Sequence, residues 1–317
     1  MIGWKKWIRK RKKVTLLGAM AVLFGTLLTG CVDQSGGSTS ADVRKVEVVQ
    51  EKTEEQTKDS PRVIATSMAV VEICDKLGIP LVGVPESSLS EIPERYEEAK
   101  TVGTPMSPDI EIVSSLNPDW ILSPVSLRSD LQPKYEQLNT KYAFLNLNSI
   151  PGMYQSISQL GQIFGKEDEA QALVDDFVTF YNNYQKSHEG KDAPTVLVLM
   201  GLPGSYVVAT ENSYVGSLVA MAGGKNVYAG EEGDFLNINT EDMLKKDPDI
   251  ILRTAHALPD QVMEMFSEEF KTNDIWKHFK AVKEDKVYDL SYSKFGMSAT
   301  FDYKDALQEL DTLLYGE

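Results

Sequence analysis

The sequence has few cysteines, few histidines and an excess of negative charge. Its 317 residues include 2 cysteines, 3 histidines and 32 Lys plus Arg against 47 Asp plus Glu, which gives a formal net charge of −15. Nucleic-acid binding needs a basic patch, so this charge balance argues against it. Neither a Gly-x-Ser-x-Gly elbow nor a His-Glu-x-x-His helix occurs. Because only three scattered histidines remain for a triad or metal site, hydrolytic catalysis is not expected.

The N-terminus has the layout of a bacterial lipoprotein signal peptide. Seven Lys and Arg residues precede an apolar stretch from Val14 to Leu28, which is followed by Thr29-Gly30-Cys31. The apolar stretch is short for a spanning helix, which needs about 20 apolar residues; an ordinary membrane anchor is the alternative. Since Leu28 to Cys31 resembles a lipobox, we expect cleavage of residues 1–30, attachment of diacylglycerol and palmitate at Cys31, and a place on the outer face of the plasma membrane. Cleavage also makes the formal charge −15 − 7 = −22.

Once Cys31 carries lipid, Cys74 is the only other cysteine, so no internal disulfide can form. Cys74 lies in an apolar segment with no neighbouring histidine, and we predict a buried structural thiol instead of a reactive one. Residues 31–60 contain few large apolar groups and are predicted to be a flexible tether.

The most informative pattern is a duplicated unit. The segment from Glu111 to Leu122 returns as the segment from Glu241 to Leu252, and the offset is 241 − 111 = 130. Each copy predicts a short amphipathic helix, a Pro-Asp corner and an apolar strand, because proline ends a helix and the apolar run suits a buried strand. Two copies of one unit predict two similar α/β lobes.

Apolar spacing places the remaining elements. Residues 61–165 begin with a β-α-β pattern and form the predicted N-terminal lobe, and residues 191–317 form the predicted C-terminal lobe. Between them, within residues 166–190, a helical pattern runs from Glu167 to His188, which corresponds to a helix of about 33 Å at 1.5 Å per residue. The expected fold is therefore α/β, with two Rossmann-like lobes linked by a single long helix.

The histidines differ in their predicted surroundings. His256 follows the apolar strand of the second unit, at the carboxyl end where open α/β sheets present ligands. His188 ends the long helix and is expected to be solvated, and His278 is expected to pack within a short helix. Met106 stands in a loop between prolines, where packing is the ordinary interpretation. By location alone, His256 is the best candidate ligand.

Four segments carry a family resemblance: residues 103–108, 199–206, 253–259 and 273–279. They resemble segments of the haem-binding lipoproteins among the substrate-binding proteins of ABC importers. The resemblance implies a class III periplasmic-binding-protein-like fold, no enzymatic activity, and haem b (iron protoporphyrin IX) as the transported ligand. It also implies that Met106 and His256 are the axial ligands of the haem iron, a recognised pairing that favours ferrous iron.

The resemblance implies further haem contacts near the propionates, where helix N-termini can stabilise anions. These candidates follow the first two predicted strands and are Thr66, Ser67, Met68, Ser87 and Ser88. Helix capping and loop polarity are the alternative interpretation. Tyr206 follows Gly201 to Gly204, a turn without the Lys-Ser/Thr ending of a phosphate loop, and is a candidate for shaping the pocket or a part of a structural loop.

The expected partners are an ABC permease with its ATPase and upstream surface haem-transfer proteins. In this class a glutamate on each lobe docks the permease, which assigns that role to Glu111 and Glu241; solvated helix glutamates are the alternative. Rival ligands in the same class are an iron siderophore or cobalamin. Siderophore pockets usually offer several arginines, and the second lobe has little beyond Arg253. A lipid-anchored cell-wall hydrolase is the rival from another class.

Overall fold

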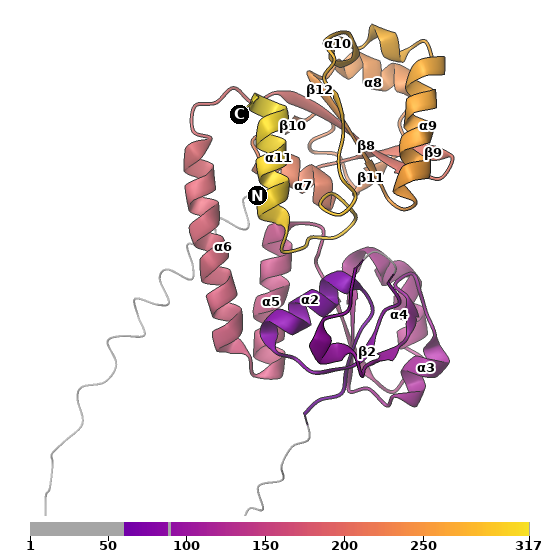
Figure 1. Ribbon diagram of the computed structural model, residues 1–317, viewed down its shortest axis with the longest axis vertical. Coiled ribbons are helices and arrows are strands. Elements are labelled where there is room, and N and C mark those ends of the chain that lie inside the picture. The colour runs from indigo at the N-terminus through magenta and orange to yellow at the C-terminus, as the bar shows by residue number, and fades with distance from the viewer. Residues whose placement is uncertain (1–59, 88–89, 317) are drawn as a thin grey trace, which may run out of the picture. The chain divides into compact units, whose positions relative to one another are not determined.

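A computed structural model describes residues 60–87 and 90–316 (Figure 1). The predicted signal peptide, the lipidation site Cys31, nearly all of the tether and Ser88 lie outside the described residues. In the part that is described, none of the helices combines the length and the hydropathy needed to cross a bilayer. Residues from Pro61 onward belong to one structural unit, and the predicted lobe boundaries stay a prediction.

The first sheet contains five parallel strands in the order β3-β2-β1-β6-β7. Its strands are β1 (Val63–Ala65), β2 (Leu81–Val84), β3 (Lys100–Thr101), β6 (Trp120–Pro124) and β7 (Lys141–Leu145). The helices of this part are α2 (Met68–Leu77), η1 (Glu94–Tyr96), α3 (Ile110–Ser115), η2 (Val125–Leu127) and α4 (Arg128–Tyr135). A small hairpin of β4 (Gly103–Thr104) and β5 (Ser107–Pro108) lies outside the main sheet. The predicted β-α-β beginning is thus present.

The second sheet is mixed, with the order β11-β9-β8-β12-β13 and with β10 also pairing β8. Its strands are β8 (Thr195–Leu202), β9 (Ser205–Ala209), β10 (Lys225–Asn226), β11 (Phe235–Leu236), β12 (Ile250–Ala255) and β13 (Val287–Asp289). The helices that follow these strands are α7 (Tyr214–Met221), α8 (Thr240–Lys246), α9 (Pro259–Thr272), η3 (Trp276–His278) and α10 (Lys280–Lys283). Strands β8, β12 and β13 are parallel, while β9 is antiparallel to β8.

Both copies of the duplicated unit fold as predicted. The first gives α3 and β6, and the second gives α8 and β12. Each helix begins at a side-chain cap, with Asp109 accepting hydrogen bonds at α3 and Asn239 at α8. These caps satisfy N–H groups that the helices leave unpaired.

The Pro-Asp corners are equivalent in backbone detail as well. The residue before each proline is left-handed, with φ of 44° at Asn117 and 38° at Asp247, a conformation that Asn and Asp tolerate. Asp119 then accepts the backbone N–H of Arg62 at 2.8 Å, and Asp249 accepts that of Thr195 at 2.9 Å. Each corner therefore holds the start of the neighbouring parallel strand, which explains why the sequence repeats there.

Two long helices, α5 (Ile150–Phe164) and α6 (Glu167–Ser187), lie in the chain between the two sheets, and a third, α11 (Tyr303–Tyr315), is its last element (Figure 1). The predicted long helix is α6, whose 21 residues correspond to about 31 Å. Aromatic rings join the three helices, since Tyr154 stacks on Phe177 at 4.3 Å and donates its hydroxyl group to that of Tyr303 at 3.3 Å. Helix α6 thus packs against both α5 and α11.

The expectation that His188 is solvated was wrong. Its side chain is only 8% exposed, and its Nε2 lies 2.8 Å from Asp311 Oδ1. The same carboxylate accepts the Tyr184 hydroxyl at 2.6 Å. The pairing of His188 with Asp311 therefore joins the end of α6 to α11. The expectation for the other histidine was also wrong, because His278, which was expected to be packed, is exposed in η3.

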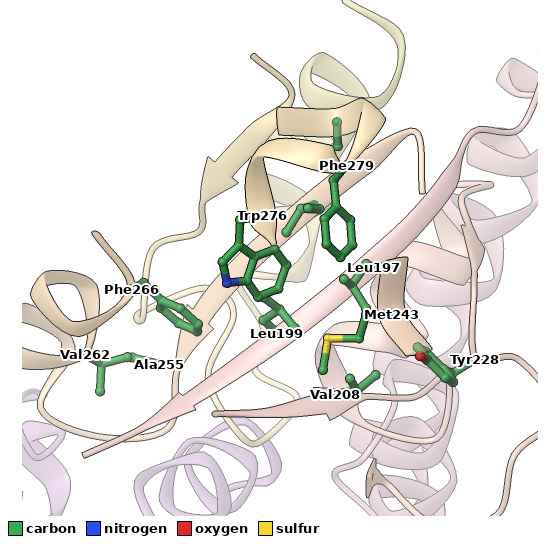
Figure 2. Packing of buried hydrophobic residues seen from close by; sticks show 12 residues of the cluster. Leu197, Leu199, Val208, Tyr228, Met243, Ala255, Val262, Phe266, Trp276 and Phe279 are labelled. Atoms are coloured by element: carbon green, nitrogen blue, oxygen red, sulfur yellow. The ribbon is translucent and has the colours of Figure 1, made fainter. Parts of the chain in front are cut away.

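The cores are apolar and closely packed. Figure 2 shows the core beneath the second sheet, where Trp276 is fully buried beside Phe266 and Phe279. On the first-sheet side, Cys74 is buried and unpaired, and burial raises the pKa of its thiol. The prediction of a buried cysteine is confirmed.

Candidate functional site

The predicted site residues of the first half lie at one edge of the first sheet. Because β1, β2 and β3 are parallel, their carboxyl ends share an edge, and ligands of open α/β sheets bind at such edges. Thr66 to Met68 follow β1, Ser87 follows β2 and the β4–β5 hairpin follows β3. A backbone bond from Glu86 to Gly103 O, 2.8 Å long, holds the hairpin beside the segment after β2.

Met106 occupies the turn of this hairpin and is 62% exposed. The turn is fixed at Gly103, whose φ is 92° and where a Cβ atom would meet Ser107 O at 3.0 Å. A large apolar side chain so exposed gains nothing from burial in the chain itself. Its thioether is free to meet a ligand, which the ordinary packing interpretation did not anticipate.

His256 follows the carboxyl end of β12 and is half-buried. Its backbone N–H donates to Gly201 O at 2.9 Å, which places the residue beside the end of β8. Burial lowers the pKa of the imidazole, and among the described residues no side chain or carbonyl bonds to the ring. A neutral imidazole with free nitrogens is the form that coordinates a metal.

A bare metal ion would lack ligands here. Within residues 60–87 and 90–316, no group of three or more His, Cys, Asp or Glu side chains could hold one.

The two hydroxyl groups after β1 differ in their bonding. Thr66 is buried and its Oγ1 lies 2.7 Å from Ser123 Oγ and 3.3 Å from Leu122 O, so this hydroxyl is already bonded. Ser67 is the N-cap residue of α2, yet its side chain makes no cap bond, and its buried Oγ has no partner among the described residues. A buried hydroxyl group without a partner is unfavourable and calls for an explanation.

The other candidates near this edge are arranged as follows. Met68 is the half-buried first residue of α2, and Ser87 Oγ accepts the backbone N–H of Ser90 at 3.1 Å. Asn148, after β7, donates to Asp234 Oδ2 at 2.8 Å, and Leu147 O accepts from Ala299 at 2.7 Å. These last contacts join the edge to the second half of the chain. No local sequence pattern indicates them.

Tyr206 is engaged within the second half. Its hydroxyl group donates to Glu269 at 3.1 Å and lies 3.2 Å from Thr240 Oγ1. Its ring lies 5.8 Å from that of Phe266 and 6.1 Å from that of Trp276. These contacts give Tyr206 a packing role, and its part in shaping a pocket stays a prediction.

Arg253 is also engaged. Its guanidinium forms a two-pronged pair with Asp289, with distances of 2.6 and 2.8 Å, and lies over the ring of Phe270 at 4.8 Å. The side chain is only 11% exposed. The single arginine of this strand is therefore held by the protein itself and is not presented to an anionic ligand.

Glu111 and Glu241 lie in the first turns of α3 and α8, and both are exposed. Neither carboxylate has an ion pair or hydrogen bond with another described side chain. The two glutamates therefore occupy equivalent, exposed positions in the two copies of the duplicated unit.

Two sheets flanked by helices, with the long helix α6 between them in the chain, are typical of substrate-binding proteins. The chain matches the periplasmic binding protein family over residues 63–292 and belongs to that family. It is 43% identical over 265 residues to the high-affinity heme uptake system protein IsdE of Staphylococcus aureus (strain Newman), covering 83% of this chain and 90% of the relative.

Solved structures of substrate-binding proteins are also similar to this chain. An ABC transporter substrate-binding protein from Listeria monocytogenes EGD-e is 45% identical with a TM-score of 0.77, covering 81% of this chain and all (100%) of that one. The structure of S. aureus IsdE complexed with heme is 43% identical with a TM-score of 0.76, covering 80% of this chain and 99% of that one. The resemblance and the fold class predicted from the sequence are confirmed.

Proposed function

We propose that this protein is the haem-binding lipoprotein of an ABC importer, which receives haem b outside the cell and delivers it to a membrane permease for iron acquisition. The observation that carries the proposal is the 43% identity to a haem uptake protein over most of both chains. Similar proteins work in transport, so the chain acts by binding and release and not by catalysis.

In this proposal Met106 and His256 are the axial ligands of the haem iron. The porphyrin supplies four nitrogens, which leaves two positions for the protein. Two features support the assignment: Met106 is an exposed thioether on a fixed hairpin, and burial lowers the pKa of His256, whose ring is not bonded to any other described residue. A His/Met pair favours ferrous iron.

Ser67 and the N-terminus of α2 are proposed to bind a haem propionate. The unpartnered Oγ of Ser67 supports this, because a carboxylate would accept its hydrogen bond and the free N–H groups of the helix would stabilise the charge. Thr66, whose hydroxyl is already bonded, would hold the strand end in place.

The rival ligands receive less support. A ferric siderophore is usually an anionic chelate, and Arg253 is already paired with Asp289. Cobalamin would need room for a bulky corrin, and none of the contacts described above is specific to it. The hydrolase alternative lacks a catalytic motif in the sequence.

Delivery is proposed to rest on two further features. Lipid on Cys31 would hold the protein at the outer face of the plasma membrane, near surface haem-transfer proteins and the permease with its ATPase. Glu111 and Glu241 would pair with basic sites on the two halves of the permease, steering and orienting the complex more than adding affinity.

The test of function is a ligand comparison. The full chain, purified in detergent, is titrated with haemin, cobalamin and a ferric hydroxamate chelate, and protein-dependent absorption changes are recorded. The proposal expects saturable uptake of haemin at one per chain and none of the other two. Uptake of the chelate or of cobalamin, without uptake of haemin, would refute it.

A further inference from the structure

Leu258 breaks several local preferences at once. It is left-handed, with φ of 48° and ψ of 58°, and its side chain is 52% exposed. It is also the N-cap residue of the 14-residue helix α9 and offers no side-chain cap, although Ser, Thr, Asp and Asn are preferred there. Finally, it precedes Pro259, and the residue before a proline favours extended backbone.

Leu258 differs in residue type from the other non-glycine residues with a left-handed backbone. The other non-glycine residues with positive φ in the described chain are Asn117, Asp247 and Asp285. All three are Asn or Asp, the residue types that tolerate this conformation because their short polar side chains bond locally. Leucine has no such compensation. The described protein gains neither a cap nor full burial from having leucine at this position.

The position of Leu258 in the fold suggests that its side chain contacts a ligand. Leu258 lies two residues after His256 in the same β12–α9 connection. Large apolar side chains that stand exposed in the described part are few, namely Met106, Ile163 and Leu258. Two of these three are thus the proposed methionine ligand of iron and a residue two positions from the proposed histidine ligand. Strain and unfavourable exposure at one residue tend to mark functional sites.

We infer that Leu258 is a specificity-determining residue that covers the ligand's flat apolar face on the side of His256. This rests on the proposed function. A planar porphyrin would bury the side chain that the unliganded protein leaves in water, and the leucine would exclude water from the bond between the iron and the imidazole. A polar chelate would leave it exposed, so the residue favours a macrocycle with apolar faces.

The test separates stability from binding. In Leu258→Gly the backbone is free to adopt positive φ and the exposed side chain is absent, and Leu258→Asn keeps a side chain that tolerates the same conformation. For both variants in the full-length protein, we expect the melting temperature of the haem-free form to be unchanged or higher. We expect loss of haem to excess apomyoglobin to be roughly tenfold faster, as for exposure of one large apolar side chain. Ile163→Ala, an exposed apolar residue on α5, should lose haem at the unchanged rate.

The outcomes are distinct. A lower melting temperature in both leucine variants would assign the side chain to packing and overturn the inference. So would haem loss at the unchanged rate while the unaltered protein binds haem. Failure of the unaltered protein to bind haem would overturn the proposed function and this inference together.

Discussion

Neighbouring hydroxyl groups at the end of β1 predict opposite effects on stability. Ser67→Ala removes a buried hydroxyl group that has no partner among the described residues, whereas Thr66→Val removes one that contacts Ser123 and Leu122. Both substitutions delete one hydroxyl and change volume little. They differ in whether a hydrogen bond is lost, so they form a matched pair.

The expected change in the free energy of unfolding follows from the hydrogen bonds that each hydroxyl group makes. A net hydrogen bond contributes about 0.5–1.5 kcal/mol, so Thr66→Val should lower the free energy of unfolding by that amount. Leaving a buried hydroxyl unsatisfied costs about 1–3 kcal/mol, so Ser67→Ala should leave the haem-free protein equally stable or more stable by up to about 1 kcal/mol. No helix cap is lost, since the Ser67 side chain makes none.

Binding should respond in the other direction. If Ser67 donates to a propionate, a hydrogen bond to a charged group is lost, at about 1.5–3 kcal/mol, and haem affinity should fall by roughly 10- to 150-fold in Ser67→Ala. Urea unfolding of the haem-free protein and haemin titration measure the two effects. Equal destabilisation by the two substitutions, or unchanged haem affinity in Ser67→Ala, would refute the reasoning.

Three further outcomes are expected. Hydrogen bonds from Lys280 and Thr195 hold the pKa of Asp249 well below its usual range, so the stability that its ionised carboxylate contributes is present above about pH 4 and is lost as the pH falls further. Asp249→Asn should therefore be less stable than the unaltered protein at pH 7, and its free energy of unfolding in urea should fall less steeply in acid. His188→Ala removes the bond to Asp311 and should cost about 1–3 kcal/mol by the same unfolding assay; an unchanged midpoint would contradict the assigned bond. Since burial lowers the pKa of His256, haem affinity should be constant from pH 8 down to about 6.5 and fall only below it; a fall between pH 8 and 7 would contradict a neutral ligand.

The sequence predicted the fold of the duplicated unit because the signals for its helix, corner and strand all lie within twelve consecutive residues. An apolar period, a proline and an apolar run define helix, corner and strand in Glu111 to Leu122 and again in Glu241 to Leu252. The left-handed residues at the corners are Asn117 and Asp247, residue types that tolerate this conformation, but the sequence pattern did not predict it. Fold class was therefore accessible from the sequence.

Long-range contacts were not accessible in this way. His188 was misplaced because its partner Asp311 lies 123 residues away on another helix. Likewise, the partner of Tyr206 is Glu269, 63 residues distant, and nothing near either residue indicates the pairing. Candidate ligands were found because a loop methionine and a strand-end histidine have local placements that resemble a known family. Which of the neighbouring hydroxyl groups already have hydrogen-bond partners could be learned only from the folded structure, as Thr66 and Ser67 show.

Axial ligation by Met106 and His256 is tested most directly by absorption spectra of the haem complex in single variants. Met106→Ala and His256→Ala should each shift the Soret band and the visible bands, with imidazole added to the His256 variant restoring a six-coordinate spectrum. His278→Ala, which alters an exposed histidine in η3, should leave the spectrum unchanged. Spectra of the Met106 and His256 variants that coincide with that of the unaltered protein would contradict the account.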